Sequence, residues 1–322
     1  MTAIIEFKDV GKSYEEKQVI EHLNLTVNEG DFFVLVGPSG SGKTSTLKMI
    51  NGLSVPTQGD IYFKEKRILD YDIQKLRLKM GYVLQQIALF PTMTVAQNIE
   101  VIPEMLGWSK ERRVARVDEL LESVGLEPEK YRHRLPKELS GGEQQRIGIL
   151  RAIAAKPDII LMDEPFSALD PLSRASLQET IQTIHQKYGT TVVFVTHNMK
   201  EAIRLGTKIA VMKDGKLLQC DTPEQIQKNP INTFVRTFFN ETTEEVMKKE
   251  KITVATIMAL GMYTKQGNDF LEYSSTISTS ATIEELSTLL IDNDAILIRE
   301  NDEILGTISR QDVFRFLSQN ER

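Results

Sequence analysis

The sequence predicts an α/β fold, in which a mostly parallel sheet is covered by helices and is followed by a smaller module. Short, continuous apolar runs at residues 32–36, 159–162 and 191–195 are typical of strands that are buried on both faces. Helical patterns lie between them, and the longest runs from Val95 to about Val124. Strands that alternate with helices favour a parallel sheet. A length of 322 residues is enough for about two domains.

The first sixty residues add strands that are exposed on one face. Residues 4–10 and 23–27 alternate apolar and polar side chains, which is the pattern of a half-buried strand. Residues 28–30 form a turn into the apolar run at 32–36, and a second turn at 56–60 precedes another short strand. We therefore expect the chain to begin with strands.

The composition excludes several classes of protein. Cys220 is the only cysteine, so an intramolecular disulfide is ruled out and a reducing compartment is favoured. The favoured interpretation of Cys220 is a small buried apolar residue, and a catalytic thiol is the alternative. The N-terminus does not have the pattern of a signal peptide, and no apolar run approaches the roughly 18 residues of a membrane span. The sequence predicts a cytosolic protein, which leaves docking on a membrane protein open.

Charge is unevenly distributed along the chain. The formal net charge is −6 and the pI is about 5.5, whereas a general nucleic-acid binder needs a basic surface. Residues from Lys251 onward include six Lys or Arg and eleven Asp or Glu, so about −5 of the −6 lies in this tail. We therefore expect no nucleic-acid partner and a separate C-terminal module. The predicted parts are a first domain at 1–240, a charged helical linker at 241–252 and a second domain at 253–322.

Residues 37–44, with the sequence GPSGSGKT, fit the phosphate-loop pattern G-x-x-x-x-G-K-[ST] at every fixed position. A strand-like run precedes them and a helical pattern follows them, as the motif requires. Glycines let backbone N–H groups point inward, and the helix N-terminus adds partial positive charge where phosphate oxygens bind. We expect Lys43 to reach the β- and γ-phosphates and the Thr44 hydroxyl to bind Mg²⁺. A glycine turn without a ligand is the alternative. The predicted nucleotide-binding residues of this segment are Gly37, Pro38, Ser39, Gly40, Ser41, Gly42, Lys43, Thr44 and Ser45.

Two carboxylates follow the apolar run at 159–162. Asp163 is expected to lie beside the phosphate loop and to hold Mg²⁺ through water. Glu164 points differently and suits a general base that polarises the attacking water. The alternative is that two acids simply end a strand at the surface, but the order of the motifs favours the catalytic interpretation.

Two further polar residues follow strand-like runs. His197 comes 33 residues after Glu164 and is expected to contact the γ-phosphate and hold the transition-state geometry. A structural histidine is the alternative. Gln85 is predicted to lie at the γ-phosphate and Mg²⁺ side, as a catalytic residue and a metal ligand. A polar loop residue is its alternative, and the neighbouring Gln86 is the other candidate for the same role.

Tyr14 is the candidate for contact with the base. Aromatic rings stack on the faces of bases, so we expect Tyr14 to stack on an adenine ring. The alternative is a packed, partly buried tyrosine.

A second glycine-rich stretch, LSGGEQQR, occupies residues 139–146. Paired glycines after a serine at a helix N-terminus form another anion-binding element. One phosphate loop does not need two such elements for one nucleotide. We therefore expect a head-to-tail pair of chains, in which this stretch contacts the γ-phosphate of the partner's ATP. The predicted contact residues are Ser140, Gly141, Gly142 and Gln144.

Together these residues resemble the nucleotide-binding subunit of ATP-binding cassette (ABC) transporters, over roughly residues 3–240. The resemblance implies the P-loop NTPase fold of an ABC cassette, with a mixed β-sheet core and a helical subdomain, that binds ATP and Mg²⁺ and hydrolyses ATP. It also implies a nucleotide contact for Asp170, which ends the D-loop. The matching motifs are Walker A at 37–44, the Q-loop at Gln85, the signature at 140–144, Walker B at 159–163 with Glu164 catalytic, the switch His197 and the A-loop aromatic Tyr14.

The chain looks like the separate ATPase subunit of an importer. Residues 89–99, residues 160–174 and the tail are similar to the branch that imports glycine betaine, carnitine, choline or related quaternary amines. This resemblance implies three kinds of partner: a second copy of the chain, membrane-spanning permease subunits and, indirectly, an extracytoplasmic substrate-binding protein or domain. It also implies a place at the cytoplasmic face of the cell membrane.

Residues 276–317 are similar to one cystathionine-β-synthase (CBS) module, a small α+β unit that reads helix, strand, turn, strand, helix. Residues 305–312 are its most recognisable part, and 253–258 is similar to a fragment of a second copy. The resemblance implies regulation through a nucleotide ligand. A dimerisation or packing role is the alternative.

Two other functions compete with uptake of a quaternary amine. One is a soluble ABC protein of translation or DNA repair, but such proteins resemble twin cassettes or carry long coiled-coil insertions, and this sequence has neither. The other is an importer of another small amine or an amino-acid-like solute, because the transported substrate is recognised by other subunits.

Overall fold

The computed structural model describes residues 2–15, 17–85, 88–167, 169, 171–239, 253–265, 275–300 and 303–320. The chain divides into two compact units, residues 1–239 and 240–322. The first unit ends at residue 239, whereas the sequence predicted that the first domain ends at residue 240. The predicted helical linker at 241–252 lies outside the described residues, as do Gln86 and Asp170.

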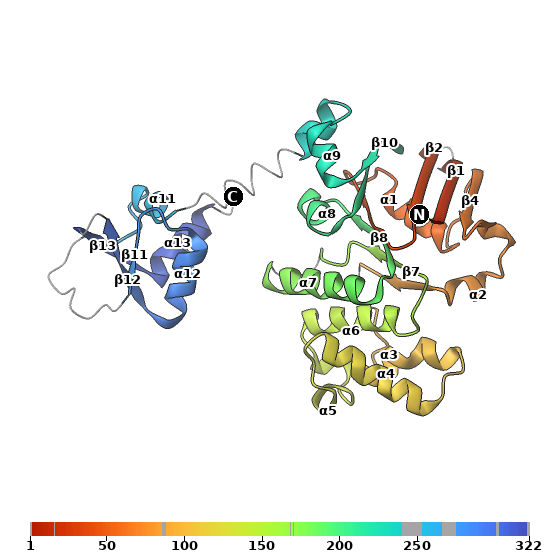
Figure 1. The fold of residues 1–322 in the computed structure, drawn as a ribbon, viewed down its shortest axis with the longest axis horizontal. Helices are drawn as coiled ribbons and strands as arrows, with labels where there is room; N and C mark the ends of the chain where they lie inside the picture. Colours follow the sequence, from red (N-terminus) through yellow and green to blue (C-terminus); the bar gives the residue numbers. More distant parts are fainter. Residues whose placement is uncertain are drawn as a thin grey trace. The chain divides into compact units, whose positions relative to one another are not determined.

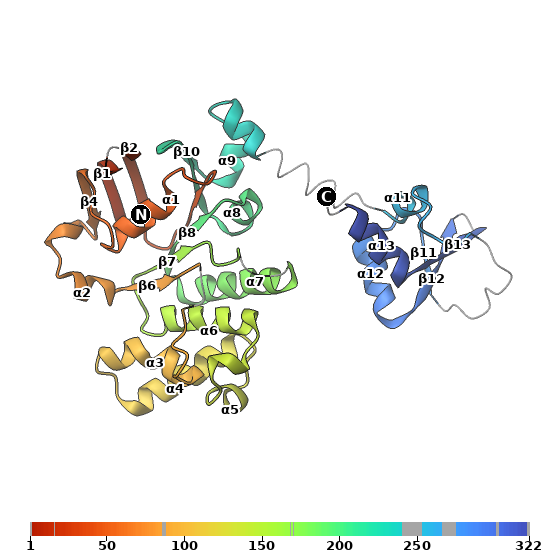
Figure 2. The same ribbon diagram turned by 180° about the vertical axis from the view of Figure 1, so that it is seen from behind.

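A six-stranded sheet forms the centre of the first unit (Figures 1 and 2). Its order is β10-β9-β3-β8-β7-β6, and every neighbouring pair is parallel except β10 and β9. The predicted runs at 32–36, 159–162 and 191–195 are its three adjacent strands β3, β7 and β8, so this prediction is confirmed. The strands are β3 (Phe32–Val36), β6 (Met80–Val83), β7 (Ile159–Asp163), β8 (Thr191–Thr196), β9 (Lys208–Lys213) and β10 (Lys216–Asp221).

Strand β3 shows why the central strands are apolar throughout. Phe32 and Val34 pack into a core with helices, whereas Phe33 and Leu35 pack into a second core on the other face of the sheet. Because successive side chains of a strand point to opposite faces, a strand with a core on each side has no polar face. Every residue of β3, β7 and β8 is accordingly buried.

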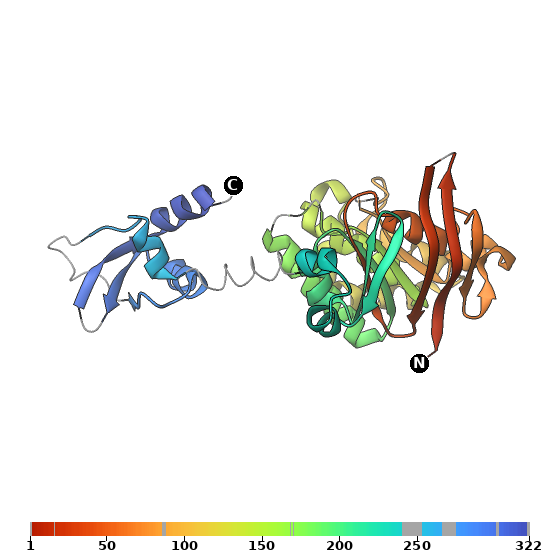
Figure 3. The same ribbon diagram turned by 90° about the horizontal axis from the view of Figure 1, so that it is seen from above.

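A separate antiparallel sheet in the order β2-β1-β4-β5 covers the second core, and Figure 3 shows β1 and β2 as a long pair. The first two strands are longer than the alternating segments predicted at 4–10 and 23–27, because bulges interrupt the alternation of apolar and polar side chains. The register of β1 against β2 shifts between Phe7 and Val10, and Asp9 and His22 have positive φ. The strands are β1 (Ala3–Tyr14), β2 (Lys17–Asn28), β4 (Gln58–Phe63) and β5 (Lys66–Arg67).

The predicted helical stretch at 95–124 is two helices. The first ends at Met105, Gly107 turns the chain at φ +73°, and the Ser109 side chain accepts from the backbone N–H of Arg112 to begin the second. The Arg112 guanidinium lies 3.4 Å from the Trp108 ring in this turn. Figure 1 shows α6 between α7 and this helical layer. The helices are α3 (Val95–Met105), α4 (Lys110–Ser123), α5 (Pro128–Tyr131), α6 (Gly141–Ile153) and α7 (Pro171–Tyr188).

Shorter helices complete the first unit. They connect strands or follow the last strand of the sheet. They are α1 (Lys43–Ile50), the 3₁₀ turn η1 (Ile68–Asp70), α2 (Ile73–Arg77), the 3₁₀ turn η2 (Pro136–Glu138), α8 (Met199–Leu205), α9 (Pro223–Lys228) and a helix at 233–239.

The second unit has its own apolar core, formed mainly by two helices against a three-stranded sheet. Strand β12 lies between β11, to which it is parallel, and β13, to which it is antiparallel. Thr264 and Thr307 exchange backbone hydrogen bonds of 2.9 and 3.0 Å, which hold the segment after α11 against β13. The elements are α11 (Val254–Ala259), β11 (Thr276–Ile277), α12 (Ile283–Asp292), β12 (Ala295–Glu300), β13 (Glu303–Ser309) and α13 (Arg310–Asn320).

Cys220 lies in β10, half-buried beside the second core. Burial raises the pKa of its thiol to about 11, so the thiol is protonated and weakly nucleophilic near pH 7. This environment fits the packing interpretation of Cys220. Across the residues that the structure describes, no helix is both long enough and apolar enough to cross a membrane.

Candidate functional site

The glycine-rich segment 37–42 connects β3 to α1 and bends the chain where side chains would not fit. Gly37 has φ +157°, and a Cβ there would lie 2.0 Å from the Met212 carbonyl oxygen of β9. Gly42 has φ +97° and lies against Ile20. The loop is therefore pressed against two neighbouring strands, and glycine is required at both positions for reasons of space and conformation.

Gly37→Ala is expected to lower the free energy of unfolding of the first unit by about 3 kcal/mol or more, because the added methyl group would clash with the backbone of β9. Gly40→Ala is the matched control. Gly40 has φ +80°, but a Cβ added there would meet nothing within 4 Å, so only the conformational cost of about 1 kcal/mol applies. Urea denaturation of both variants tests this difference. Equal destabilisation would show that contact with β9 does not shape the loop.

Lys43 begins α1 and folds back into the loop. Its ammonium donates to the carbonyl oxygens of Gly37 at 2.8 Å and Pro38 at 2.9 Å, and to Ser41 Oγ at 3.4 Å. The side chain is buried, and this burial lowers its pKa, although the carboxylates of Asp163 and Glu164 oppose the shift. A buried cation is thus held at the centre of the predicted phosphate loop.

Thr44 and Asp163 meet at the end of the sheet. The Thr44 hydroxyl donates to Asp163 Oδ1 at 3.0 Å, which brings together two residues that are 119 positions apart. Burial raises the pKa of Asp163, and the hydrogen bond from Thr44 opposes that shift. Mg²⁺ binds oxygen ligands such as hydroxyl and carboxylate groups, usually together with water and substrate phosphates. The pair therefore fits the predicted magnesium site.

Glu164 and His197 form a second pair. Glu164 Oε1 lies 3.2 Å from His197 Nδ1, and the Glu164 side chain is 21% exposed whereas that of His197 is 57% exposed. Glu164 has φ +42°, an uncommon conformation for a side chain of this type, and its N–H donates to the Val195 carbonyl oxygen at 3.0 Å. The adjacent acids Asp163 and Glu164 therefore have different partners.

Tyr14 lies at the end of β1, beside α1. Its hydroxyl is 3.3 Å from Ser54 Oγ, and hydrogen bonding to Ser54 lowers its pKa, with a smaller contribution from Ser45. The Lys12 ammonium lies 4.6 Å from the centre of the ring. Tyr14 is 45% exposed, so part of its side chain is accessible to solvent.

The signature segment begins α6. The Ser140 side chain accepts from the Glu143 N–H at 3.3 Å, and the Glu143 carboxylate accepts from the Ser140 N–H at 2.8 Å, so the two form a capping box. Tyr131 donates to the same carboxylate at 2.6 Å. Ser140 and Gly141 are exposed, and a Cβ on Gly141 would meet nothing within 4 Å. In the described part of the chain, no hydrogen bond or ion pair joins residues 139–144 to the phosphate loop.

The structure therefore brings two groups of predicted residues together and leaves a third apart. Lys43, Thr44 and Asp163 form the first group, and Glu164 and His197 form the second. The signature residues lie in a different part of the unit, at the start of α6. Gln85 is exposed after β6, and Asp170 lies outside the described residues.

Two residues that contact segments next to the candidate site were not predicted from the sequence. Gln145 in α6 is buried, and its amide donates to the Pro165 carbonyl oxygen at 3.0 Å, next to Glu164. The Arg151 guanidinium donates to the Ala88 carbonyl oxygen at 2.7 Å, in the segment after Gln85. A polar residue on the apolar face of a helix was the available signal for Gln145.

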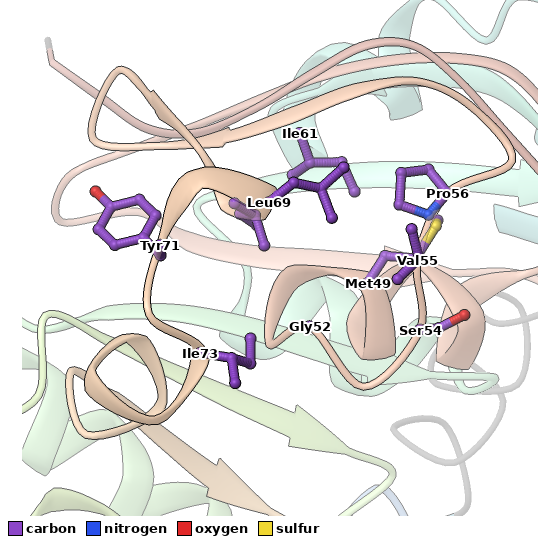
Figure 4. Close-up of a pocket in the computed structure, with 10 residues that line it drawn as sticks. Met49, Gly52, Ser54, Val55, Pro56, Ile61, Leu69, Tyr71 and Ile73 are labelled. Atoms are coloured by element: carbon purple, nitrogen blue, oxygen red, sulfur yellow. The ribbon is translucent and has the colours of Figure 1, made fainter.

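A separate cavity of about 180 Å³ lies between α1, β4 and α2 (Figure 4). Ser54 lines it, and the same side chain contacts Tyr14. Its lining has no charged side chain, so it lacks the cations that phosphate groups need. The lining residues are Met49, Gly52, Ser54, Val55, Pro56, Ile61, Ile68, Leu69, Tyr71 and Ile73.

Comparison with known proteins identifies the family. A profile of the family described as "ABC transporter" matches residues 20–167. The chain is 43% identical over 295 residues to "Carnitine transport ATP-binding protein OpuCA" of Listeria monocytogenes, which covers 91% of this chain and 74% of that protein. This chain therefore belongs to the ABC transporter family and is an ABC-type ATPase, which confirms the predicted family and the predicted ABC ATPase fold.

Two further relatives cover different shares of the chain. "Glycine betaine/carnitine/choline transport ATP-binding protein OpuCA" of Bacillus subtilis is 39% identical over 97% of this chain and 84% of its own length. "Fe(3+) ions import ATP-binding protein FbpC" of Fusobacterium nucleatum is 41% identical over 75% of this chain and 64% of its own length. The first of these matches therefore extends through most of the second unit.

Among solved structures, the chain is similar to the ATP-binding cassette MJ0796 in a dimeric post-hydrolysis state bound to ADP and Pi. The TM-score is 0.60 and the sequence identity is 35%, over 68% of this chain and 98% of that one. This likeness supports the cassette fold of the first unit.

Proposed function

We propose that this chain is the ATP-hydrolysing subunit of an importer for a quaternary amine such as glycine betaine, carnitine or choline. The observation that carries the substrate class is the extent of similarity. The relative named for these three solutes matches 97% of the chain, whereas the relative named for Fe(3+) matches 75%. Relatives named for carnitine, for these three solutes and for osmoprotectant import each match 91% or more of the chain. A match of about three quarters of the chain does not discriminate the solute, because relatives named for choline and glycine betaine match 73 to 78% of it.

ATP would bind with its phosphates in the loop at 37–44. Its negative charge would be met by the Lys43 ammonium, by inward-pointing N–H groups and by the N-terminus of α1. Thr44 and Asp163, already joined by a hydrogen bond of 3.0 Å, would hold Mg²⁺, with Gln85 at its γ-phosphate side. Bound Mg²⁺ supplies charge that neutralises the phosphate oxygens. Tyr14 would stack on the adenine ring, and its position beside Ser45 of α1 supports that role.

Hydrolysis would depend on the pair formed by Glu164 and His197. Glu164 would accept a proton from the attacking water as general base. His197, 3.2 Å from Glu164, would orient that carboxylate and contact the γ-phosphate. The uncommon backbone conformation of Glu164 supports a functional role, because such conformations are retained where a side chain must be aimed.

Each ATP would be completed by a second copy of the chain. The exposed start of α6, with Ser140, Gly141, Gly142 and Gln144, would contact the γ-phosphate of the partner's ATP. The separation of this segment from the phosphate loop within one chain supports the idea, as does the dimeric state of the related cassette MJ0796. ATP binding would close the pair, and hydrolysis would release it. Asp170, which ends the D-loop of the family pattern, would contact the nucleotide.

The second unit would be a CBS-like domain that regulates or dimerises the subunit, and its regulatory ligand would be a nucleotide. Its order of α12, β12, β13 and α13 supports this assignment. The domains would be 1–240 and 253–322, joined by the linker at 241–252. The chain would lie at the cytoplasmic face of the membrane, bound to permease subunits that receive solute from an extracytoplasmic binding protein.

An uptake assay tests the proposed function. The chain and the permease and binding-protein genes next to its own gene are expressed in a host without osmoprotectant importers. Uptake of labelled glycine betaine, carnitine and choline is measured at high osmolarity, with ferric iron and amino acids as competing substrates. We expect uptake of at least one quaternary amine, and its loss in the Lys43→Met variant. Uptake of iron or amino acids alone would overturn the assigned substrate class.

A further inference from the structure

A small cavity of about 70 Å³ lies beside the proposed catalytic pair. Glu164 and His197 line it, and so do Arg174 of α7 and Glu201 of α8. The proposed reaction uses Glu164 and His197 but gives no role to Arg174 or Glu201. The second carboxylate at this cavity therefore needs an explanation.

Glu201 is connected to the residues on both sides of His197. The Thr196 hydroxyl donates to Glu201 Oε2 at 2.6 Å, and the Asn198 N–H donates to the Thr196 oxygen at 3.0 Å. Thr196 and Glu201 are 2% and 7% exposed. A hydroxyl has one proton to donate, so the Glu201 carboxylate fixes the direction of the Thr196 O–H bond. The lone pairs of the Thr196 oxygen are then left to accept from the Asn198 N–H. One buried carboxylate thus holds the bend of the chain that carries His197.

Stability alone does not account for this carboxylate. Burial raises the pKa of Glu201, which means that the buried environment disfavours its charged form. The hydrogen bond from Thr196 and the positive charge of Arg174 oppose that shift. Buried charged groups of this kind are commonly no more stabilising than apolar side chains of similar size. A role in the site explains why a glutamate is placed here.

Arg174 connects the same cluster to the segment after Glu164. Its guanidinium donates to the Leu169 carbonyl oxygen at 3.1 Å, and its charge favours the ionised form of Glu201. The Ser167 hydroxyl in turn donates to the Glu164 carbonyl oxygen at 3.0 Å. The cluster therefore lies between the bend that carries His197 and the turn that carries Glu164.

We propose that Glu201 is a positioning residue for ATP hydrolysis: acting through Thr196, it fixes the bend that presents His197 to Glu164. The proposal rests on the proposed ATPase mechanism and extends it to a residue that does not touch the substrate. The role of Glu201 is to set the position of His197. Such positioning affects the rate because a displacement of about 1 Å at a reacting pair can lower a rate about a hundredfold.

The test uses the full-length chain and steady-state ATPase kinetics. Glu201→Met keeps the approximate size of the side chain and removes both carboxylate oxygens, so that the Thr196 hydroxyl loses its acceptor, and Thr196→Val removes the hydroxyl itself. We expect each to lower kcat about ten- to hundredfold with KM for ATP within about twofold of wild type. Thr196→Ser keeps the hydroxyl and should retain near-wild-type kcat. Glu224→Met, at an exposed glutamate in the first turn of α9, is the matched control and should leave kcat unchanged.

A double-mutant cycle separates positioning from a general loss of structure. If Glu201 acts through His197, Glu201→Met should change the residual kcat of His197→Ala by less than about twofold. An equal factor of loss in the wild-type and His197→Ala backgrounds, or an unchanged kcat in Glu201→Met, would overturn the proposal. Wild-type protein without ATPase activity would instead contradict the proposed function. If the Glu201 variant does not fold, the contrast between Thr196→Val and Thr196→Ser decides, and equal kcat values would refute the proposal.

Discussion

Glu164→Gln is expected to lower ATP turnover by about a hundredfold or more while ATP still binds, because the amide cannot accept a proton from the attacking water. The side chain keeps its size, and the Lys43, Thr44 and Asp163 cluster that would hold the phosphates and Mg²⁺ is unchanged. Release of phosphate measures the first effect, and titration with a fluorescent ATP analogue measures the second.

The matched control for this variant is Glu179→Gln, which alters an exposed glutamate of α7 that pairs with Arg204. It should hydrolyse ATP at the wild-type rate, because exposed ion pairs contribute little to stability or to a distant site. Near-wild-type turnover in Glu164→Gln would show that another group takes the proton and would contradict the assigned base.

Lys43→Met should weaken ATP binding about ten- to hundredfold, since the ammonium would make charge-assisted hydrogen bonds to phosphate oxygens. Turnover should fall with it. Lys48→Met, at an exposed lysine in the last turn of the same helix, is the control and should bind ATP normally. Isothermal titration calorimetry of both variants checks the difference. Equal affinities would show that the loop at 37–44 does not bind phosphate.

The stability of Lys43→Met provides an independent check. Removal of the ammonium leaves the carbonyl oxygens of Gly37 and Pro38 without this donor, which is destabilising. It also removes the cost of a buried charge, which is stabilising. We expect these effects to offset, so that the free energy of unfolding without ATP changes by about 1 kcal/mol or less. The rise in melting temperature on adding ATP should be smaller than in wild type at the same ATP concentration.

The central strands and the phosphate loop could be predicted because their constraints are local. Each residue of β3 is apolar because a core lies on either side of the sheet, and this leaves a continuous run in the sequence. The loop motif contains its own glycines and its own lysine. The adjacency of Thr44 and Asp163 followed from topology, since parallel strands β3 and β7 end at the same edge of the sheet.

Features that depend on tertiary contacts could not be predicted. The N-terminal strands extend past their alternating segments because bulges at Asp9 and His22 reset the pattern. The role of Glu201 depends on its turning inward to Thr196. In the sequence, Asn198 followed three residues later by Glu201 is typical of a helix N-terminus whose glutamate caps the backbone. Only the packing of α8 against β8 shows that the carboxylate has another partner.

The central claim is that each ATP site is shared between two chains, and cross-linking tests it most directly. The starting chain carries Glu164→Gln, so that bound ATP is not hydrolysed, and Cys220→Ser, which removes the native thiol. Ser39→Cys and Ser140→Cys are then introduced together at two exposed positions of this chain. A short thiol cross-linker is added with and without ATP. We predict that ATP produces a covalent species of twice the 36.5 kDa chain mass, and that chains carrying only Ser39→Cys or only Ser140→Cys produce much less. Cross-links within single chains, or dimers that form equally without ATP, would contradict a shared site.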